Sequence, residues 1–292
     1  MRAESLFGRG FSPITWNCGR YRLNIRRPLV MAIVNVSPDS FSGDGILVKG
    51  MDIEGHLSAL VESGADIIDI GGESTRPGSS PVSEQEELDR VLPFVEVAVT
   101  LGVPVSVDTS KSTVMNASIA LGADIINDVF ALRGDGSVGA VCDSSAGVVL
   151  MHMKGSPDKM QQFPSYDDVV SEVVSFIEDR VCACVDAGIS RSRLCIDPGI
   201  GFGKSLEHNL SLFSRLSDFV KMNLPLLVGP SRKSYLFHLL GRSVEDRLPG
   251  TLAACLASCS YGAHILRVHD VAAVRDALIF WKRVVATEWG EF

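Results

Sequence analysis

Polar and charged side chains stand at the ends of several short apolar runs in this chain. Carboxylates and amides can hold the N–H groups of a polar ligand, and arginine and lysine can hold an anion. The residues concerned are Asn35, Asp108, Asn127, Met151-His152, Asp197, Ser231-Arg232-Lys233-Ser234 and Arg267-Val268-His269. Any one of them could cap a helix or complete a turn, and a helical stretch does follow Asp108 directly. Six or more at equivalent places indicate a shared site.

The apolar runs themselves have the length and β-branched content of buried parallel strands. There are eight: Leu29–Asn35, Asp66–Gly71, Val103–Asp108, Asp124–Asp128, Gly147–His152, Arg193–Asp197, Leu224–Gly229 and His264–His269. Longer amphipathic stretches alternate with them, including Ser83–Leu101, Tyr166–Ala187, Ser205–Val220 and Arg247–Tyr261. Eight such units predict an α/β fold, a single (β/α)8 TIM barrel, whose active site lies at the carboxyl ends of the strands.

The first 28 residues stand outside this alternation and predict a β-hairpin. Its segments are Ile14–Asn17, the turn Cys18-Gly19, and Arg20–Ile25. We expect this hairpin, within residues 1–28, to cap the lower end of the barrel, and residues 29–292 to form the barrel domain.

A weak internal repeat supports the barrel. The segment Gly64–Asp69 is echoed by Gly122–Asn127, and in both a glycine ends a helix immediately before the next strand begins. Any α/β protein can repeat such turns, so the repeat bears on architecture and not on chemistry.

Three of the loops that follow predicted strands are long and rich in glycine, at residues 35–45, 71–78 and 197–204. Loops at this face of a barrel usually carry function. Glycine there suits the close approach of backbone to a ligand, or a hinge.

The bulk properties exclude some classes of protein. A net charge of −8 and a pI near 5.3 argue against nucleic acid as a partner. The longest apolar runs are too short to span a membrane, and the charged, glycine-containing start of the chain does not resemble a signal peptide. An odd count of seven cysteines argues against a disulfide framework. We therefore expect a cytoplasmic protein without membrane or nucleic-acid partners.

Eight motifs, in order and mostly at predicted strand ends, resemble those of the dihydropteroate synthase family. They are Met31–Asn35 with Ser37–Ser42, Gly71–Gly78 (GGESTRPG), Ser106–Lys111 (SVDTSK), Ile126–Val129 (INDV), Met151–Gly155 (MHMKG), Asp197–Lys204 (DPGIGFGK), Ser231–Ser234 (SRKS) and Arg267–Asp270 (RVHD). The resemblance covers nearly the whole chain. It departs in the first loop, where the family usually reads Asp-Gly-Gly and this chain reads Gly43-Asp44-Gly45.

The resemblance implies that an arylamine, p-aminobenzoate, displaces pyrophosphate from the methylene carbon of a dihydropterin. Such a leaving group needs cationic and metal contacts that strengthen as the C–O bond breaks. The family match makes Arg267 and His269 the pyrophosphate ligands, with Asn35 joining them and helping to hold Mg2+. His269 alone could be a buried structural histidine, but it stands two residues from Arg267 on the same face of the strand.

The same resemblance implies a pterin pocket. Asp197 would accept the adjacent N–H donors of the ring, Asn127 would meet neighbouring ring nitrogens, and Lys233 the ring carbonyl or N5. Asp108 would stabilise the positive charge that develops on the pterin. Met151 is either barrel core or the floor under the ring. Asp108, Lys233, Arg267 and His269 are the expected catalytic residues.

For p-aminobenzoate, we expect three residues to sandwich the ring, namely Phe41, Pro77 and Phe202. Ser234 opens a helix whose N–H groups suit the carboxylate. Thr75 and Arg76 are placed near this substrate by resemblance alone.

Two other functions compete with the synthase. A pterin-dependent methyltransferase barrel would share the Asp and Asn contacts but would have less need for Arg267 and His269. A non-catalytic pterin-binding paralogue would be expected to lack some of the charged strand-end residues. Barrel enzymes often pair, so we expect a homodimer.

Overall fold

The computed structural model describes residues 12–36, 52–74, 81–155, 160 and 164–285. Its centre is an eight-stranded parallel sheet in the order β8-β7-β6-β5-β4-β3-β10-β9. The strands are β3 (Leu29–Asn35), β4 (Ile67–Gly71), β5 (Val105–Asp108), β6 (Ile125–Asp128), β7 (Gly147–Met151), β8 (Leu194–Asp197), β9 (Leu227–Val228) and β10 (Ile265–Val268). The backbone N–H of Ile196 in β8 donates to the Pro225 carbonyl at 2.9 Å, which closes the sheet beside β9.

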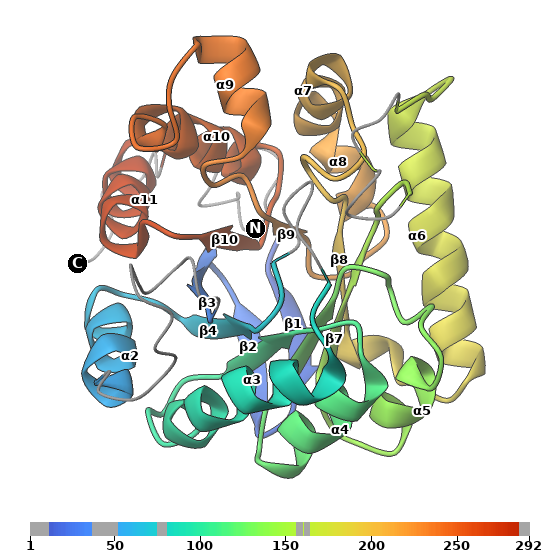
Figure 1. Ribbon diagram of the computed structural model, residues 1–292. Helices are drawn as coiled ribbons and strands as arrows, with labels where there is room; N and C mark the ends of the chain where they lie inside the picture. Colours follow the sequence, from blue (N-terminus) through green and yellow to red (C-terminus); the bar gives the residue numbers. More distant parts are fainter. Residues whose placement is uncertain (1–11, 37–51, 75–80, 156–159, 161–163, 286–292) are drawn as a thin grey trace, which may run out of the picture.

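Helices surround this barrel, and Figure 1 shows them following one another around the strands in sequence order. They are α2 (Ile53–Glu62), α3 (Glu84–Ala98), α4 (Ser112–Ala120), α5 (Ser137–Cys142), α6 (Val169–Asp186), the 3-10 turn η1 (Arg191–Arg193), α7 (Leu206–Ser214), α8 (Leu216–Val220), α9 (Ser234–Leu240), α10 (Leu248–Ser260) and α11 (Val271–Val285). The prediction of a single (β/α)8 barrel is therefore confirmed.

Two elements differ from the sequence-based expectation. The stretch Ser205–Val220 divides into α7 and α8 at Arg215, whose φ of −120° leaves the helical region. In the strand expected over Leu224–Gly229, only Leu227–Val228 form a regular strand, and Leu226 forms an isolated bridge to Ile196. Pro225 has no N–H to give to the ladder, which shortens this strand.

An antiparallel hairpin, β1 (Ile14–Cys18) and β2 (Tyr21–Ile25), precedes the barrel. Its turn is Gly19-Arg20, one residue later than the sequence suggested, because Gly19 supplies the positive φ of 55°. The buried side chains of Trp16, Cys18 and Ile25 pack onto apolar residues from seven barrel strands: Met31, Ile67, Ile125, Val149, Cys195, Leu227 and Ile265.

This apolar layer positions the candidate site, because side chains of a strand that share a face recur every second residue. Two residues beyond each member of the layer, nearer the carboxyl end of the barrel, stand Ile33, Asp69, Asn127, Met151, Asp197, Gly229 and Arg267. Four of the seven, Asp69, Asn127, Asp197 and Arg267, form a polar layer that lies directly on the apolar one. Ser106 and Asp108 repeat the same spacing on β5.

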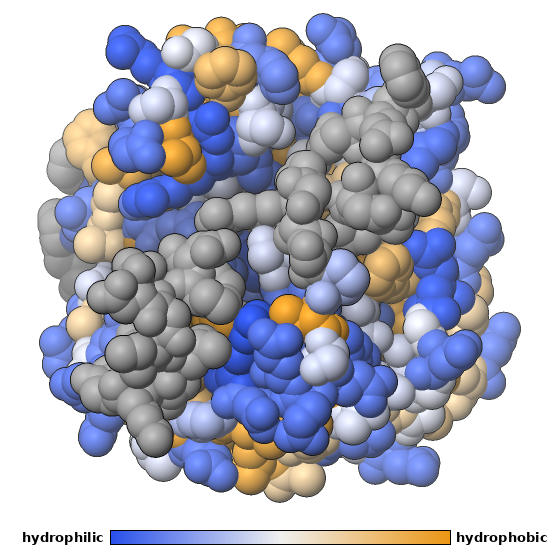
Figure 2. All heavy atoms as spheres, viewed as in Figure 1, coloured by the Kyte–Doolittle hydropathy of each residue, from blue (hydrophilic) through white to orange (hydrophobic). Residues whose placement is uncertain are grey.

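The surface and the thiols add three facts. Exposed apolar side chains gather on α9, at Phe237, Leu239 and Leu240, near the top of the view in Figure 2. Among the described residues, no helix is both long enough and apolar enough to cross a membrane. All seven cysteines are free thiols, and Cys182 is exposed.

Candidate active site

The centre of the polar layer is an ion cluster around Arg267 of β10. Its Nε donates to Oδ2 of Asp69 at 2.6 Å, and a terminal nitrogen donates to Oδ2 of Asp108 at 2.7 Å. Asp69 is fully buried and Asp108 nearly so. The Arg267 guanidinium therefore links β10 to the middle of β4 and to the end of β5.

Burial determines the electrostatics of this cluster. It raises the pKa of Asp108 to about 7, although Arg267 lowers it, and the Asp69 carboxylate raises it further. Burial alone would lower the pKa of Arg267, but the two carboxylates hold it above its ordinary value. Asp108 therefore changes its charge near neutral pH while Arg267 stays a cation.

Asp69 was not among the residues selected from the sequence. Besides Arg267, its Oδ2 accepts from the Asn127 side-chain amide at 3.3 Å, so Asp69 joins Asn127 to the ion cluster. The signal was present in the internal repeat, which aligns Asp69 with Asn127 at the end of Gly64–Asp69 and Gly122–Asn127. A search of strand ends does not find Asp69, because this residue lies in the middle of β4 (Ile67–Gly71) and not at its end.

Asp197 ends β8 and is oriented by the loop that follows. The Gly199 N–H donates to its Oδ1 at 2.7 Å. Gly199 has a φ of 69°, and a Cβ there would lie 1.9 Å from the His152 carbonyl oxygen, so only glycine fits. Burial raises the pKa of Asp197, and Lys233 opposes that rise.

Lys233 reaches the same region from the segment after β9. Its ammonium group donates to the Ile200 carbonyl and lies 4.4 Å from the centre of the Phe202 ring, close enough for a cation–π contact. Burial lowers its pKa to about 8, while Asp197 raises it. Lys233 therefore lies near both Asp197 and Phe202, and these three side chains are the Asp197–Lys233 wall, on which a flat ring with N–H donors could rest.

The residues on either side of Lys233 in sequence contact other groups than Lys233 does. Arg232, with a φ of 56°, turns to pair with Asp270, while Ser231 Oγ lies 3.0 Å from Nδ1 of His269. His269 therefore lies just beyond β10, tied to the segment that carries Lys233. Ser234 begins α9, and its side chain is exposed.

The two remaining predicted residues, Met151 and Asn35, end β7 and β3. Met151 is buried in an apolar cluster with Val129, Met153 and Met160, against which Phe202 also packs. Asn35 ends β3, half-buried, and is in register with Gly71 of β4.

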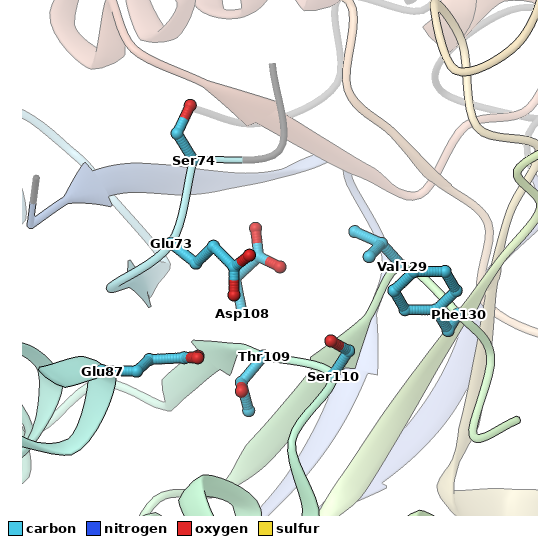
Figure 3. Close-up of a pocket in the computed structure, with 8 residues that line it drawn as sticks. All are labelled: Glu73, Ser74, Glu87, Asp108, Thr109, Ser110, Val129 and Phe130. Carbon is cyan, nitrogen blue, oxygen red and sulfur yellow. The ribbon is translucent and has the colours of Figure 1, made fainter. Parts of the chain in front are cut away.

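A pocket opens beside Asp108, between the loops that follow β4, β5 and β6. Its lining residues are Glu73, Ser74, Glu87, Asp108, Thr109, Ser110, Val129 and Phe130. Figure 3 shows Asp108 near its centre, with Glu87 extending from α3 and Phe130 on the other side. Lys111 pairs with both Glu73 and Glu87, which ties the base of the second loop to α3. Asp108 does not cap α4, because Lys111 occupies the N-cap position and the Asp108 side chain contacts Arg267 instead.

Four predicted residues, Phe41, Thr75, Arg76 and Pro77, lie outside the described residues, as does the Gly43-Asp44-Gly45 departure. The described part of the chain brings together Asp108, Asn127 and Arg267 through Asp69, and Asp197, Lys233 and Phe202 through the loop after β8.

Comparisons with known proteins show which proteins this chain resembles in sequence and fold. A family model described as "Pterin binding enzyme" matches residues 31–269. The dihydropteroate synthase of Escherichia coli K12 is 47% identical over 257 residues, covering 88% of this chain and 91% of that protein. The Yersinia pestis dihydropteroate synthase, solved with a sulfonamide drug complex, superposes with a TM-score of 0.88 at 43% identity, covering 93% and 99% of the two chains. The Xanthomonas albilineans enzyme, solved with 4-aminobenzoic acid, gives 0.87 at 46% identity, covering 95% and 100%.

Proposed function

The chain belongs to the pterin-binding enzymes, among the dihydropteroate synthases, and on this basis we propose the reaction and the role of each residue. It condenses 6-hydroxymethyl-7,8-dihydropterin pyrophosphate with p-aminobenzoate, giving 7,8-dihydropteroate and pyrophosphate, a step of folate biosynthesis. The observation that carries this proposal is the adjacency, in one barrel mouth, of the Arg267–Asp108 ion pair and the Asp197–Lys233 wall.

The pterin ring would bind on the Asp197 side. Its adjacent N–H groups suit a carboxylate that the Gly199 N–H already orients, and Asn127 would meet the neighbouring ring nitrogens. Lys233 would donate to the ring carbonyl or N5. Phe202 beside Lys233 supplies a flat aromatic face, and Met151 in the apolar cluster supplies an apolar contact for the ring.

The pyrophosphate would bind at Arg267 and His269. Arg267 exchanges its contact with Asp108 for a phosphate oxygen, while Asp69 keeps the guanidinium in place. Asp108, released from Arg267, then stabilises the positive charge that grows on the pterin methylene as the C–O bond breaks. The displacement is dissociative, because the C–O bond breaks ahead of C–N bond formation. The neutral arylamine attacks this carbon as pyrophosphate departs, and the proton that the amine nitrogen then loses passes to pyrophosphate or to solvent, so no strong general base is required.

Mg2+ is the cofactor that suits this leaving group, and Asn35 is the residue that would help to hold it. Asn35 offers one amide oxygen, and the described residues contain no group of three or more His, Cys, Asp or Glu that could hold a metal. Such a donor set fits Mg2+, which usually takes several ligands from water and from substrate phosphates. When bound, the ion would neutralise charge on the departing pyrophosphate.

For p-aminobenzoate, we assign Phe202, with Phe41 and Pro77, to the ring, and Ser234 at the start of α9 to the carboxylate. Thr75 and Arg76 complete this set. The relative from Xanthomonas albilineans has been solved with 4-aminobenzoic acid, and that from Yersinia pestis with a sulfonamide drug complex, which supports this chain as a sulfonamide target.

We also propose that the enzyme works as a cytoplasmic homodimer. The exposed apolar side chains of α9, together with those of Ile279 and Phe280 on α11, offer surface that a second copy could cover. Size-exclusion chromatography with light scattering tests this assembly directly.

A direct test of the reaction is to incubate the protein with both substrates and Mg2+, and to identify the product by mass spectrometry. We expect 7,8-dihydropteroate. Pterin binding without product would favour a non-catalytic paralogue, and methyl transfer that requires a corrinoid would favour the methyltransferase alternative.

A further inference from the structure

Lys204, the last residue of the loop 197–204, is a buried lysine for which the proposed reaction has no direct use. Its side chain is almost entirely buried, and the residue is only 3% exposed. Its Nζ lies 2.9 Å from the carbonyl oxygens of Gly199 and of Phe202, and 3.0 Å from Nδ1 of His152. No described carboxylate forms a salt bridge with it. The His152 carbonyl oxygen lies 3.4 Å from the same nitrogen, so four acceptors surround a group that has three N–H donors when protonated.

These acceptors belong to the backbone on which the pterin wall is built. Lys204 holds the carbonyls of Gly199 and Phe202, while Lys233 holds the carbonyl of Ile200 between them. The N–H of Gly199 in turn orients Asp197. The two lysine side chains therefore hold the carbonyls of Gly199, Ile200 and Phe202 in one short loop.

The glycines of the loop allow its backbone to lie closer to its neighbours than a side chain would permit. Gly203 has a φ of 64°, and a Cβ there would lie 2.4 Å from the Lys154 carbonyl oxygen. A Cβ on Gly201, where φ is 84°, would lie 2.9 Å from Cδ of Lys233. The loop therefore packs closely against Lys154, in the segment after β7, and against Lys233. Lys204 links the loop to the same segment through its contact with His152.

We propose that Lys204 is a positioning residue for the pterin site: its ammonium group holds the carbonyls of Gly199 and Phe202 so that Asp197 and Lys233 keep their places. This inference rests on the proposed function, because it assumes that the pterin binds at Asp197 and Lys233. Lys204 itself would not touch the substrate.

The experiment compares the wild-type enzyme with Lys204→Met, which keeps the chain length and removes the ammonium group. Affinity for the pterin pyrophosphate alone is measured by calorimetry, and kcat and KM are measured with both substrates. We expect the Kd and KM for the pterin substrate to rise about tenfold or more, as for the loss of several buried hydrogen bonds, with a smaller change in kcat. Lys221→Met, at an exposed lysine, is the matched control and should change nothing.

Two further readouts separate positioning from simple stabilisation of the fold. Lys204→Gln should retain more of the pterin affinity than Lys204→Met, because the glutamine amide can still donate to the loop carbonyls. In Lys204→Ala, added ammonium or methylammonium should restore part of the pterin affinity, because the acceptor cage remains. Lys204→Gln, which keeps two N–H donors, serves if the methionine variant does not fold.

An unchanged pterin Kd, or a loss that neither added amine nor the glutamine variant relieves, would overturn the assignment. Failure of the proposed function looks different. In that case the wild-type protein itself would form no dihydropteroate, while the binding comparison between wild type and Lys204 variants would still be readable.

Discussion

Replacing Asp108 with asparagine is expected to stabilise the substrate-free protein at alkaline pH while abolishing most of its activity. Asparagine keeps an oxygen that can accept from Arg267 but removes the buried negative charge. The pKa of Asp108 is about 7 in the folded protein, against an ordinary value of 3.8. The pKa is therefore raised by about 3 units, which disfavours the charged form by about 4 kcal/mol at about 1.4 kcal/mol per unit.

The direction of the pH effect follows from where the proton is held. Between about pH 4 and pH 7 the folded protein keeps a proton on Asp108 that the unfolded chain has lost, so this group lowers stability as pH rises through that interval. Asp108→Asn should therefore unfold at higher urea than wild type at pH 8, with a gain of up to about 4 kcal/mol, and show little gain at pH 4.

Asp66→Asn is the matched control, because its carboxylate lies at the other end of the barrel and pairs with Arg27 and Arg275. Burial would raise the pKa of Asp66, but Arg27 and the other partners lower it overall, so this substitution should destabilise the protein at pH 8. A loss of stability in Asp108→Asn at pH 8, or a gain that does not depend on pH, would refute the reasoning. Activity should fall on the order of 100-fold, since a charge aimed at the transition state is lost.

Three other predictions concern the same site. Asp197→Asn should weaken pterin binding on the order of 100-fold by calorimetry, because a charged acceptor of two N–H groups is lost; unchanged binding would make Asp197 structural. The pH profile of kcat/KM for the pterin substrate should rise through about 7 as Asp108 ionises and fall above about 8 as Lys233 loses its proton, and a flat profile from 6 to 9 would contradict both assignments. Gly199→Ala should lower the melting temperature far more than Gly102→Ala, which also has positive φ but has nothing within 4 Å of the added Cβ; equal effects would show that the close approach to His152 does not matter.

The architecture could be predicted from sequence because apolar strand runs and helix-ending glycines are local signals. The prediction for Leu29–Asn35 matches β3 at both ends, and most other strands begin or end within a residue or two of the expected place. Leu224–Gly229 is the exception, because Pro225 within this run has no N–H to donate and the regular strand is shorter than predicted. The hairpin turn shifted by one residue because Gly19, and not Cys18, has the required backbone conformation.

The site could be predicted only in part, because strand ends are easier to recognise than inward-facing residues within strands. Asp69 precedes the end of β4 by two residues, yet it bonds to both Arg267 and Asn127. The role of Lys204 depends on contacts with His152, distant in sequence, and no local pattern shows them. Roles for loop residues such as Arg76 remain predictions, since periodicity does not place them.

The most direct test of the account is release of pyrophosphate from the dihydropterin pyrophosphate in the presence of Mg2+, with and without p-aminobenzoate. The wild-type protein should release pyrophosphate only when the amine is present, and Lys233→Ala should abolish that release. Binding of the pterin without any amine-dependent release would contradict the assignment of this barrel as a synthase.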